Sequence, residues 1–151
     1  MFERILIAYD QSPEAESTVT ASLALAAKLK AKVLLATVMP PVSGFTTLAN
    51  SIQAGYLRES ESEELQELTR RHRVIQEKAF AAGIEIETRI LEGSVLEELL
   101  RSIRNFHPDL VTLGLRHHGH GLDLIGTLHR IAHELDCPIM AVPNAGKFKS
   151  S

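Results

Sequence analysis

Short apolar runs recur along the chain and are separated by longer segments with helical spacing. The runs ILIAY (5–9), VLLATV (33–38), DLVTLG (109–114) and PIMAV (138–142) hold few polar residues. Such runs are typical of strands buried on both faces of a parallel sheet. IEIETRIL (84–91) alternates more clearly between apolar and polar residues, which predicts a strand at or near an edge. The pattern therefore predicts five strands.

The first helix is predicted directly after the first strand. Ser12 fits the N-cap, Pro13 the first helical position, and Glu14 lies in the favourable field of the first turn. The residues predicted to face the sheet are Val19, Leu23, Ala26 and Ala27. This helix and the strands on either side of it form a β-α-β unit.

The second helix is predicted after a long connection. Residues 39–57 contain prolines, glycines and polar residues, which indicate a loop that orders only partly. The helix is expected from residue 58 onward, with Gly83 as its stop. Its predicted sheet-facing stripe consists of Leu65, Leu68, His72, Ile75 and Ala79.

Two further helices complete the predicted domain. Ser94 and Glu97 fit a capping box at the start of one, ahead of an apolar stripe formed by Leu96, Leu99, Leu100 and Ile103. Residues 122–136 predict the other, and 144–151 a frayed tail. The alternation of strands and helices predicts one α/β domain over 1–143, with a parallel sheet and helices on both faces.

Composition narrows the class of protein. Hydrophobic residues make up 44% and charged residues 23% of the 151 residues, which is typical of a globular domain. A net charge of −3 without a basic stripe argues against a nucleic-acid partner. The N-terminus does not resemble a secretion signal, no run is long enough for a membrane helix, and the single cysteine, Cys137, is predicted to be a small buried hydrophobe. We therefore expect a cytosolic protein.

The predicted fold indicates where a ligand would bind. Open parallel sheets bind ligands outside the carboxyl ends of their strands, where the strand order reverses. The candidate loops are residues 9–11, the segment after Val38, and the stretch 113–129, which is rich in glycine and histidine. Neither the GxGxxG nor the GxxxxGK[ST] phosphate motif occurs in the chain. Glycines in 113–129 would still let backbone N–H groups approach an anion.

AYDQSPEAE, ATVMP, LG…GT and CPIMAVP together resemble the universal stress protein family over residues 2–143. The resemblance implies a Rossmann-like, adenine nucleotide alpha hydrolase-like fold with sheet order 3-2-1-4-5. It also implies a homodimer through the strand at 138–142. The implied ligand is ATP or a related adenine nucleotide such as AMP, with or without magnesium, with its phosphates in a loop of pattern G-x2-G-x9-G-[ST].

The resemblance assigns roles to individual residues. Asp10 would contact the ribose or adenine, and Ala8 and Val38 would line the base. The chain departs from the family loop, because His117 replaces the second glycine and eight residues, not nine, separate it from Gly126. Gly119 would replace the missing glycine, with Arg116, His117, His118 and His120 as side-chain partners for phosphate. The full predicted nucleotide-binding set is Ala8, Tyr9, Asp10, Val38, Leu113, Gly114, Arg116, His117, Gly119, Gly126, Thr127 and Leu128.

Several of these residues have structural alternatives. Asp10 would also close the turn before the N-cap by accepting backbone hydrogen bonds. Gly114, Gly126 and Thr127 would also fit a tight turn and a helix cap without a ligand. The histidines lack the partners and spacing of a zinc site, so no metal site is predicted.

The leading hypothesis is an adenine-nucleotide-binding sensor or regulator in the stress response. The absence of a GxSxG elbow and of magnesium ligands of the Walker type gives catalysis little support. Two alternatives stay open: a nucleotide-free dimeric interaction module of the same fold, and a slow ATP hydrolase.

Overall fold

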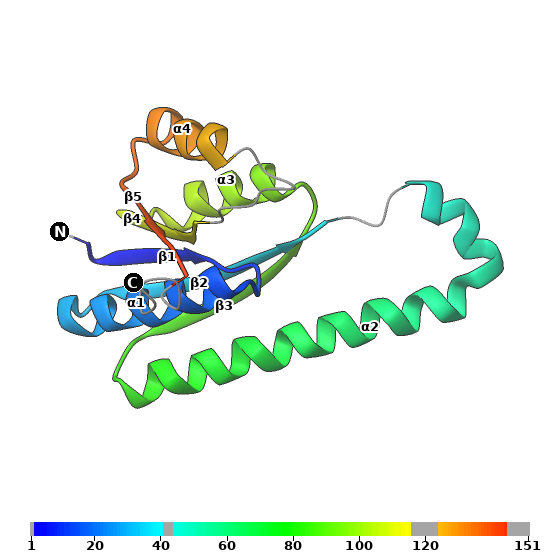
Figure 1. The fold of residues 1–151 in the computed structure, drawn as a ribbon, viewed down its shortest axis with the longest axis horizontal. Helices are drawn as coiled ribbons and strands as arrows, with labels where there is room; N and C mark the ends of the chain where they lie inside the picture. Colours follow the sequence, from blue (N-terminus) through cyan, green and yellow to red (C-terminus); the bar gives the residue numbers. More distant parts are fainter. Residues whose placement is uncertain (1, 41–43, 116–123, 145–151) are drawn as a thin grey trace.

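The structure is a computed structural model that describes residues 2–40, 44–115 and 124–144. Strands and helices alternate along the chain, as the apolar pattern predicted (Figure 1). The elements are β1 (Arg4–Ala8), α1 (Pro13–Leu29), β2 (Lys32–Met39), α2 (Gly44–Ala81), β3 (Ile86–Glu92), α3 (Val95–Phe106), β4 (Leu110–Gly114), α4 (Leu124–Glu134) and β5 (Ile139–Val142). In these described parts of the chain, no helix combines the length and apolar character needed to cross a bilayer.

The strands form one parallel sheet in the order β3-β2-β1-β4-β5. This order confirms the predicted fold class and the edge position of the 84–91 strand. Ala8 at the end of β1 lies beside Ala36 of β2 and Leu113 of β4. The chain builds the sheet outward from β1 to β3 and then returns to add β4 on the other side of β1. The strand order therefore reverses between β1 and β4.

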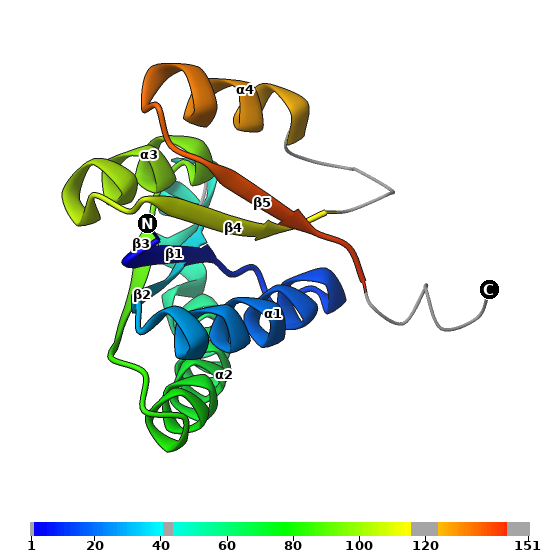
Figure 2. The same cartoon turned by 90° about the vertical axis from the view of Figure 1, so that its left-hand side faces the viewer.

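Helices cover both faces of the sheet, α1 and α2 on one and α3 and α4 on the other (Figure 2). Successive residues of a strand point to opposite faces. Ile5, Ile7 and Tyr9 accordingly pack with α1 and α2, whereas Leu6 and Ala8 belong to the core beneath α3. The position of each residue along its strand therefore decides to which face of the sheet its side chain points.

The predicted loop at 39–57 is wrong over most of its length. β2 extends to Met39, and α2 begins at Gly44 and continues as one helix to Ala81. After Pro41 the segment contains no proline, and Gly55 costs a helix only about 1 kcal/mol relative to alanine. The glycine and polar content was therefore compatible with a helix. In Figure 1 the first part of α2 projects well beyond the sheet.

The structure confirms some of the predicted helix caps and sheet-facing residues and contradicts others. Ser12 caps α1 as expected, and its side chain accepts a hydrogen bond from the Ala15 N–H. Ser94 occupies the N-cap of α3, but its side chain makes no capping hydrogen bond, so the capping box is wrong. The Glu97 carboxylate instead lies 3.5 Å from the Arg130 guanidinium of α4. Of the predicted stripe residues, Ala27 and Leu65 are exposed.

Cys137 is a buried free thiol, as predicted. Its Sγ donates a hydrogen bond to the carbonyl oxygen of Pro108 at 3.5 Å. Burial raises the pKa of this thiol, and the nearby Asp109 carboxylate raises it further. Cys137 therefore stays protonated at neutral pH and is a poor nucleophile.

Candidate functional site

Small and apolar side chains meet on one face of the sheet at the reversal point. Ala8 is the last residue of β1, Val38 and Leu113 are the last residues but one of β2 and β4, and all three point toward the α3 and α4 side. Leu113 is buried, but Ala8 and Val38 are only half-buried, although the interior residues of both strands are enclosed. The structure therefore brings together the residues predicted to line a base, and leaves part of their surface uncovered.

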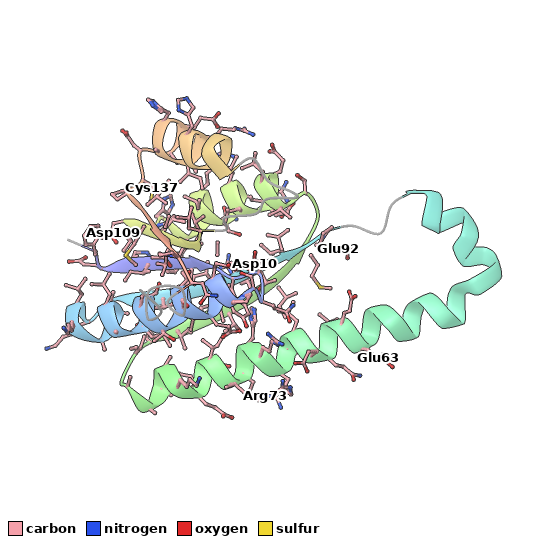
Figure 3. All side chains as sticks on the ribbon, viewed as in Figure 1. Asp10, Glu63, Arg73, Glu92, Asp109 and Cys137 are labelled. Carbon is pink, nitrogen blue, oxygen red and sulfur yellow. The ribbon has the colours of Figure 1, made fainter. Side chains whose placement is uncertain are left out.

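The turn after β1 is held by Asp10, which lies at the carboxyl edge of the sheet (Figure 3). Its Oδ1 accepts hydrogen bonds from the Ser12 N–H at 3.0 Å and the Ser12 hydroxyl at 2.5 Å. Between them, Gln11 adopts a left-handed conformation with φ of 66°. Asp10 therefore has the structural role that was left open as an alternative, and its side chain remains exposed.

Tyr9 belongs to the predicted set, but its side chain points to the opposite face. It is 2% exposed, and its hydroxyl donates a hydrogen bond to the Glu16 carboxylate of α1. Burial and this hydrogen bond raise the pKa of Tyr9 to about 12. The phenol is therefore enclosed by protein on the face of the sheet opposite to Ala8 and Val38.

Gly114 ends β4 against the start of α1. A Cβ atom placed on Gly114 would lie 2.8 Å from Glu14 Cβ, 2.9 Å from the Glu14 carbonyl carbon and 3.0 Å from the Ala15 nitrogen. No side chain fits at this position without moving the α1 backbone. The need for glycine here is therefore explained by packing against α1, which differs from the tight turn considered as the alternative for this residue.

The helices that follow the two strands at the reversal point, α1 after β1 and α4 after β4, both begin on the carboxyl side of the sheet, and their first turns differ in charge. The start of α1 carries Glu14 and Glu16, and its cap already uses the Ser12 side chain. The first turn of α4 contains no acidic residue, and Asp123, which precedes it in the sequence, lies outside the described residues. Because helix N-termini attract anions and carboxylates repel them, α4 is the better place for a phosphate.

Part of the predicted phosphate loop can be placed and part cannot. Gly126, Thr127 and Leu128 fall in α4, which begins at Leu124. Arg116, His117 and Gly119 lie outside the described residues.

The histidines of α4 give no sign of a metal centre. His129 and His133 are one turn apart, and their rings lie with centroids 4.3 Å apart and planes tilted by 41°. Within residues 2–40, 44–115 and 124–144, no group of three or more metal-ligating side chains converges. Two imidazoles supply fewer ligands than a structural zinc site requires.

A buried polar cluster on the α1 and α2 side of the sheet was not predicted. His72 of α2 lies 2.8 Å through its Nε2 from the Thr37 hydroxyl, and its ring meets the ring of Tyr9 edge-on with centroids 5.8 Å apart. The sequence contained a signal for it, because a histidine interrupts the apolar stripe of α2 and a threonine interrupts the apolar run of β2.

Comparisons with known proteins agree with the observed fold. A model of the universal stress protein family matches residues 1–143. A universal stress protein family structure from Burkholderia pseudomallei is 23% identical, with a TM-score of 0.67 over 94% of this chain and 96% of the other. An AMP-bound family protein from Arabidopsis thaliana is 14% identical, with a TM-score of 0.63 over 95% and 93%.

A universal stress protein in complex with cAMP is 20% identical, with a TM-score of 0.60 over 95% of this chain and 98% of that one. At these identities the structural likeness establishes the fold. No curated protein sequence matched the chain.

Proposed function

Because the chain belongs to the universal stress protein family, we propose that it binds an adenine nucleotide at the carboxyl edge between β1 and β4. The observation that carries the proposal is the uncovered apolar surface of Ala8 and Val38 beside Leu113, at the point where the strand order reverses. Open α/β sheets bind ligands at this point. Relatives of the same fold hold AMP and cAMP. The bound protein would act as a cytosolic sensor or regulator in the stress response.

Charge decides how the nucleotide lies. Its base would rest on Ala8 and Val38, where the surface is apolar. Its phosphates would point to the start of α4, because the acidic residues Asp10 and Glu14 lie on the α1 side, before and within the first turn of that helix. Backbone N–H groups near Gly126 and the Thr127 hydroxyl would then bind the phosphate oxygens. Arg116, His117 and Gly119 stay predicted partners on sequence grounds alone.

Nucleotide content tests the proposal directly. The purified protein is denatured by heat, the supernatant is searched for released nucleotide, and the refolded or apo protein is titrated with AMP, cAMP and ATP with and without magnesium. We expect binding of at least one of these below millimolar concentration. Absence of both carried-over nucleotide and binding would favour the nucleotide-free interaction module, for which the His117 departure argues. Release of phosphate from bound ATP would favour the slow hydrolase.

A substitution at Asp10 separates its two roles. Asp10→Asn keeps an Oδ1 acceptor for the Ser12 N–H and hydroxyl, so the turn should survive and the thermal midpoint should change by no more than about 2 °C. If the carboxylate binds the ribose, affinity for AMP should fall by about tenfold, the usual value of one charged hydrogen bond. Unchanged affinity would assign Asp10 to the turn alone.

We also propose a homodimer through β5, which pairs with β4 on one side and is an edge of the sheet. The carbonyl groups of Pro138 and Val142 accept from β4, so alternation turns the N–H of Ala141 outward. An uncovered edge of this kind favours pairing with a second copy. Ala141→Pro removes that outward donor and should convert a dimer to a monomer in light scattering. A wild-type monomer at tens of micromolar would contradict the proposal.

A further inference from the structure

The ring of His72 is held in a site that suits only its neutral form. The residue is 3% exposed, and Nε2 shares a 2.8 Å hydrogen bond with the Thr37 hydroxyl. Nδ1 is buried and has no hydrogen-bond partner. An imidazolium carries an N–H on both nitrogens, so protonation would leave a charged donor without an acceptor in the core.

The charged groups around this site do not reach Nδ1. On the α1 side, the Glu16 carboxylate accepts from the Tyr9 hydroxyl and lies 3.5 Å from Arg71. Within α2, Glu67 pairs with Arg70 and Arg71. At the sheet edge, Asp10 binds Ser12, and Glu92 at the end of β3 is exposed. β2 contributes only the uncharged Thr37, so no carboxylate stands ready to stabilise a charged His72.

His72 also occupies a critical place along α2. Leu68, His72, Ile75 and Ala79 are the buried residues of the stripe that seats α2 on the sheet. One turn earlier, Leu65 is 45% exposed, and the helix then continues beyond the sheet (Figure 1). Among the α2 residues whose side chains the structure describes, Leu68 and His72 are the first buried ones, and Arg71 between them pairs with Glu16 of α1 at 3.5 Å. Loss of the His72 contact would leave Leu68 as the one buried side chain ahead of Ile75 in this described part of the helix.

The two residues that touch His72 are neighbours of the candidate nucleotide site. Tyr9 lies between Ala8 and Asp10, and its N–H donates to the Ala36 carbonyl at 2.9 Å. Thr37 lies between Ala36 and Val38. Side chains at these strand ends alternate between the two faces of the sheet. His72 therefore packs against the ends of β1 and β2 on the α1 and α2 side, and the proposed binding surface for the base lies on the opposite side of the same strand ends.

We propose that α2 is an acid-released clamp on the nucleotide site, held closed by the neutral His72 wedged against Tyr9 and Thr37. When His72 is protonated, its ring leaves the core and the segment Leu68–Ile75 of α2 separates from the sheet. The carboxyl ends of β1 and β2 then become less ordered. In this proposal the closed state binds nucleotide more tightly than the open state does. Bound nucleotide therefore stabilises the closed state by the same free energy. This coupling rests on the proposed nucleotide binding, whereas the acid release of α2 does not.

The direction and range of the pH effect follow from burial, which lowers the pKa of His72 to about 4 from its ordinary value of 6.5. The detached state has the ordinary pKa, so it takes up a proton as the pH falls through 6.5 while the closed state does not. The contribution to stability is fully present above that value and is lost progressively toward pH 4. Between pH 7 and pH 5 the open fraction should rise roughly 20- to 30-fold.

Hydrogen exchange of the apo protein at pH 7 and pH 5, corrected for intrinsic rates, measures this opening at the amides of residues 68–75. We expect the open fraction to rise roughly 20- to 30-fold between pH 7 and pH 5 in the wild type. The control His133→Asn, which removes an exposed histidine of α4, should show the same rise. The paired change His72→Phe and Thr37→Val leaves no buried group unpaired and should abolish the pH response. If this double variant fails to fold, His72→Gln gives the same test, because glutamine keeps a hydrogen-bond partner for Thr37. Protection of 68–75 that is unchanged in the wild type, or a response that persists without His72, would overturn the clamp.

The same measurement with bound nucleotide tests the coupling between α2 and the nucleotide site. Saturating AMP at pH 5 should restore protection of residues 68–75, and affinity for AMP should fall between pH 7 and pH 5 in the wild type but much less in the His72 variants. Acid release without any effect of bound AMP would overturn the coupling. Failure of AMP, cAMP and ATP to bind at pH 7 would overturn the proposed function and the coupling, and would leave the acid release of α2 to be judged by the apo data.

Discussion

Gly114→Ala is expected to destabilise the protein by about 3 kcal/mol or more, although it adds a single methyl group. The new Cβ would lie 2.8 to 3.0 Å from backbone and Cβ atoms of Glu14 and Ala15, which no rotamer change can relieve. Overpacking of this kind costs roughly 1–3 kcal/mol, and more where the backbone must move. For a chain of this size the thermal midpoint should fall by roughly 6–12 °C.

Gly83→Ala is the matched control for this prediction. Gly83 has a φ of 75°, but a Cβ there would meet nothing within 4 Å. Its cost is therefore the left-handed strain alone, about 1–2 kcal/mol. If Gly114→Ala melts as the wild type does, or is less destabilising than Gly83→Ala, the close approach of β4 and α1 is not what requires glycine at this position.

Gly126→Val should weaken nucleotide binding by more than about tenfold, equivalent to about 1.4 kcal/mol. Gly126 falls at the start of α4, where backbone N–H groups have no partner within the helix. A branched side chain would stand between those groups and the phosphate oxygens. The apo protein should melt close to the wild type, because valine is no less favourable than glycine in a helix. Calorimetric titration with AMP measures the affinity.

Replacing His118 and His120 together by asparagine tests whether side chains bind the phosphates instead. We expect a mild loss of affinity, and mainly below about pH 6.5, where imidazolium would attract phosphate. Abolished binding at pH 8 in this double variant, together with full binding by Gly126→Val, would mean that the loop uses side chains. The assignment of the phosphates to backbone N–H groups would then be wrong.

The fold could be predicted because its strands and the start of α1 have strong local signals. The nearly continuous apolar runs of β1, β2 and β4 are buried on both faces, and Ser12 and Pro13 begin α1 as expected. The beginning of α2 could not be predicted, because Gly55 and polar residues lower helix propensity without forbidding a helix. Leu65 was expected in the core, but α2 outruns the sheet that would have covered it.

The sequence predicted which residues meet at the carboxyl ends of β1, β2 and β4, but not what each of them contacts. Strand ends and the resemblance pointed to Ala8, Val38 and Leu113, and these residues do share one face. Tyr9 was placed with them because it follows β1, although alternation already assigns it to the other face. The requirement for glycine at 114 and the contact of His72 with Thr37 depend on elements far apart in the sequence. Local patterns marked His72 and Thr37 as polar residues in apolar segments, but they could not show that these two residues meet or that Gly114 packs against α1.

Amide chemical shifts of the isotope-labelled protein during titration with AMP test the central claim most directly, because each residue reports separately. We predict saturable shifts at Ala8, Asp10, Leu113 and Gly114 and at the start of α4, and none at Gly83 on the opposite edge. Absence of shifts at millimolar AMP, or saturable shifts confined to residues away from the carboxyl ends of β1 and β4, would contradict nucleotide binding at this site.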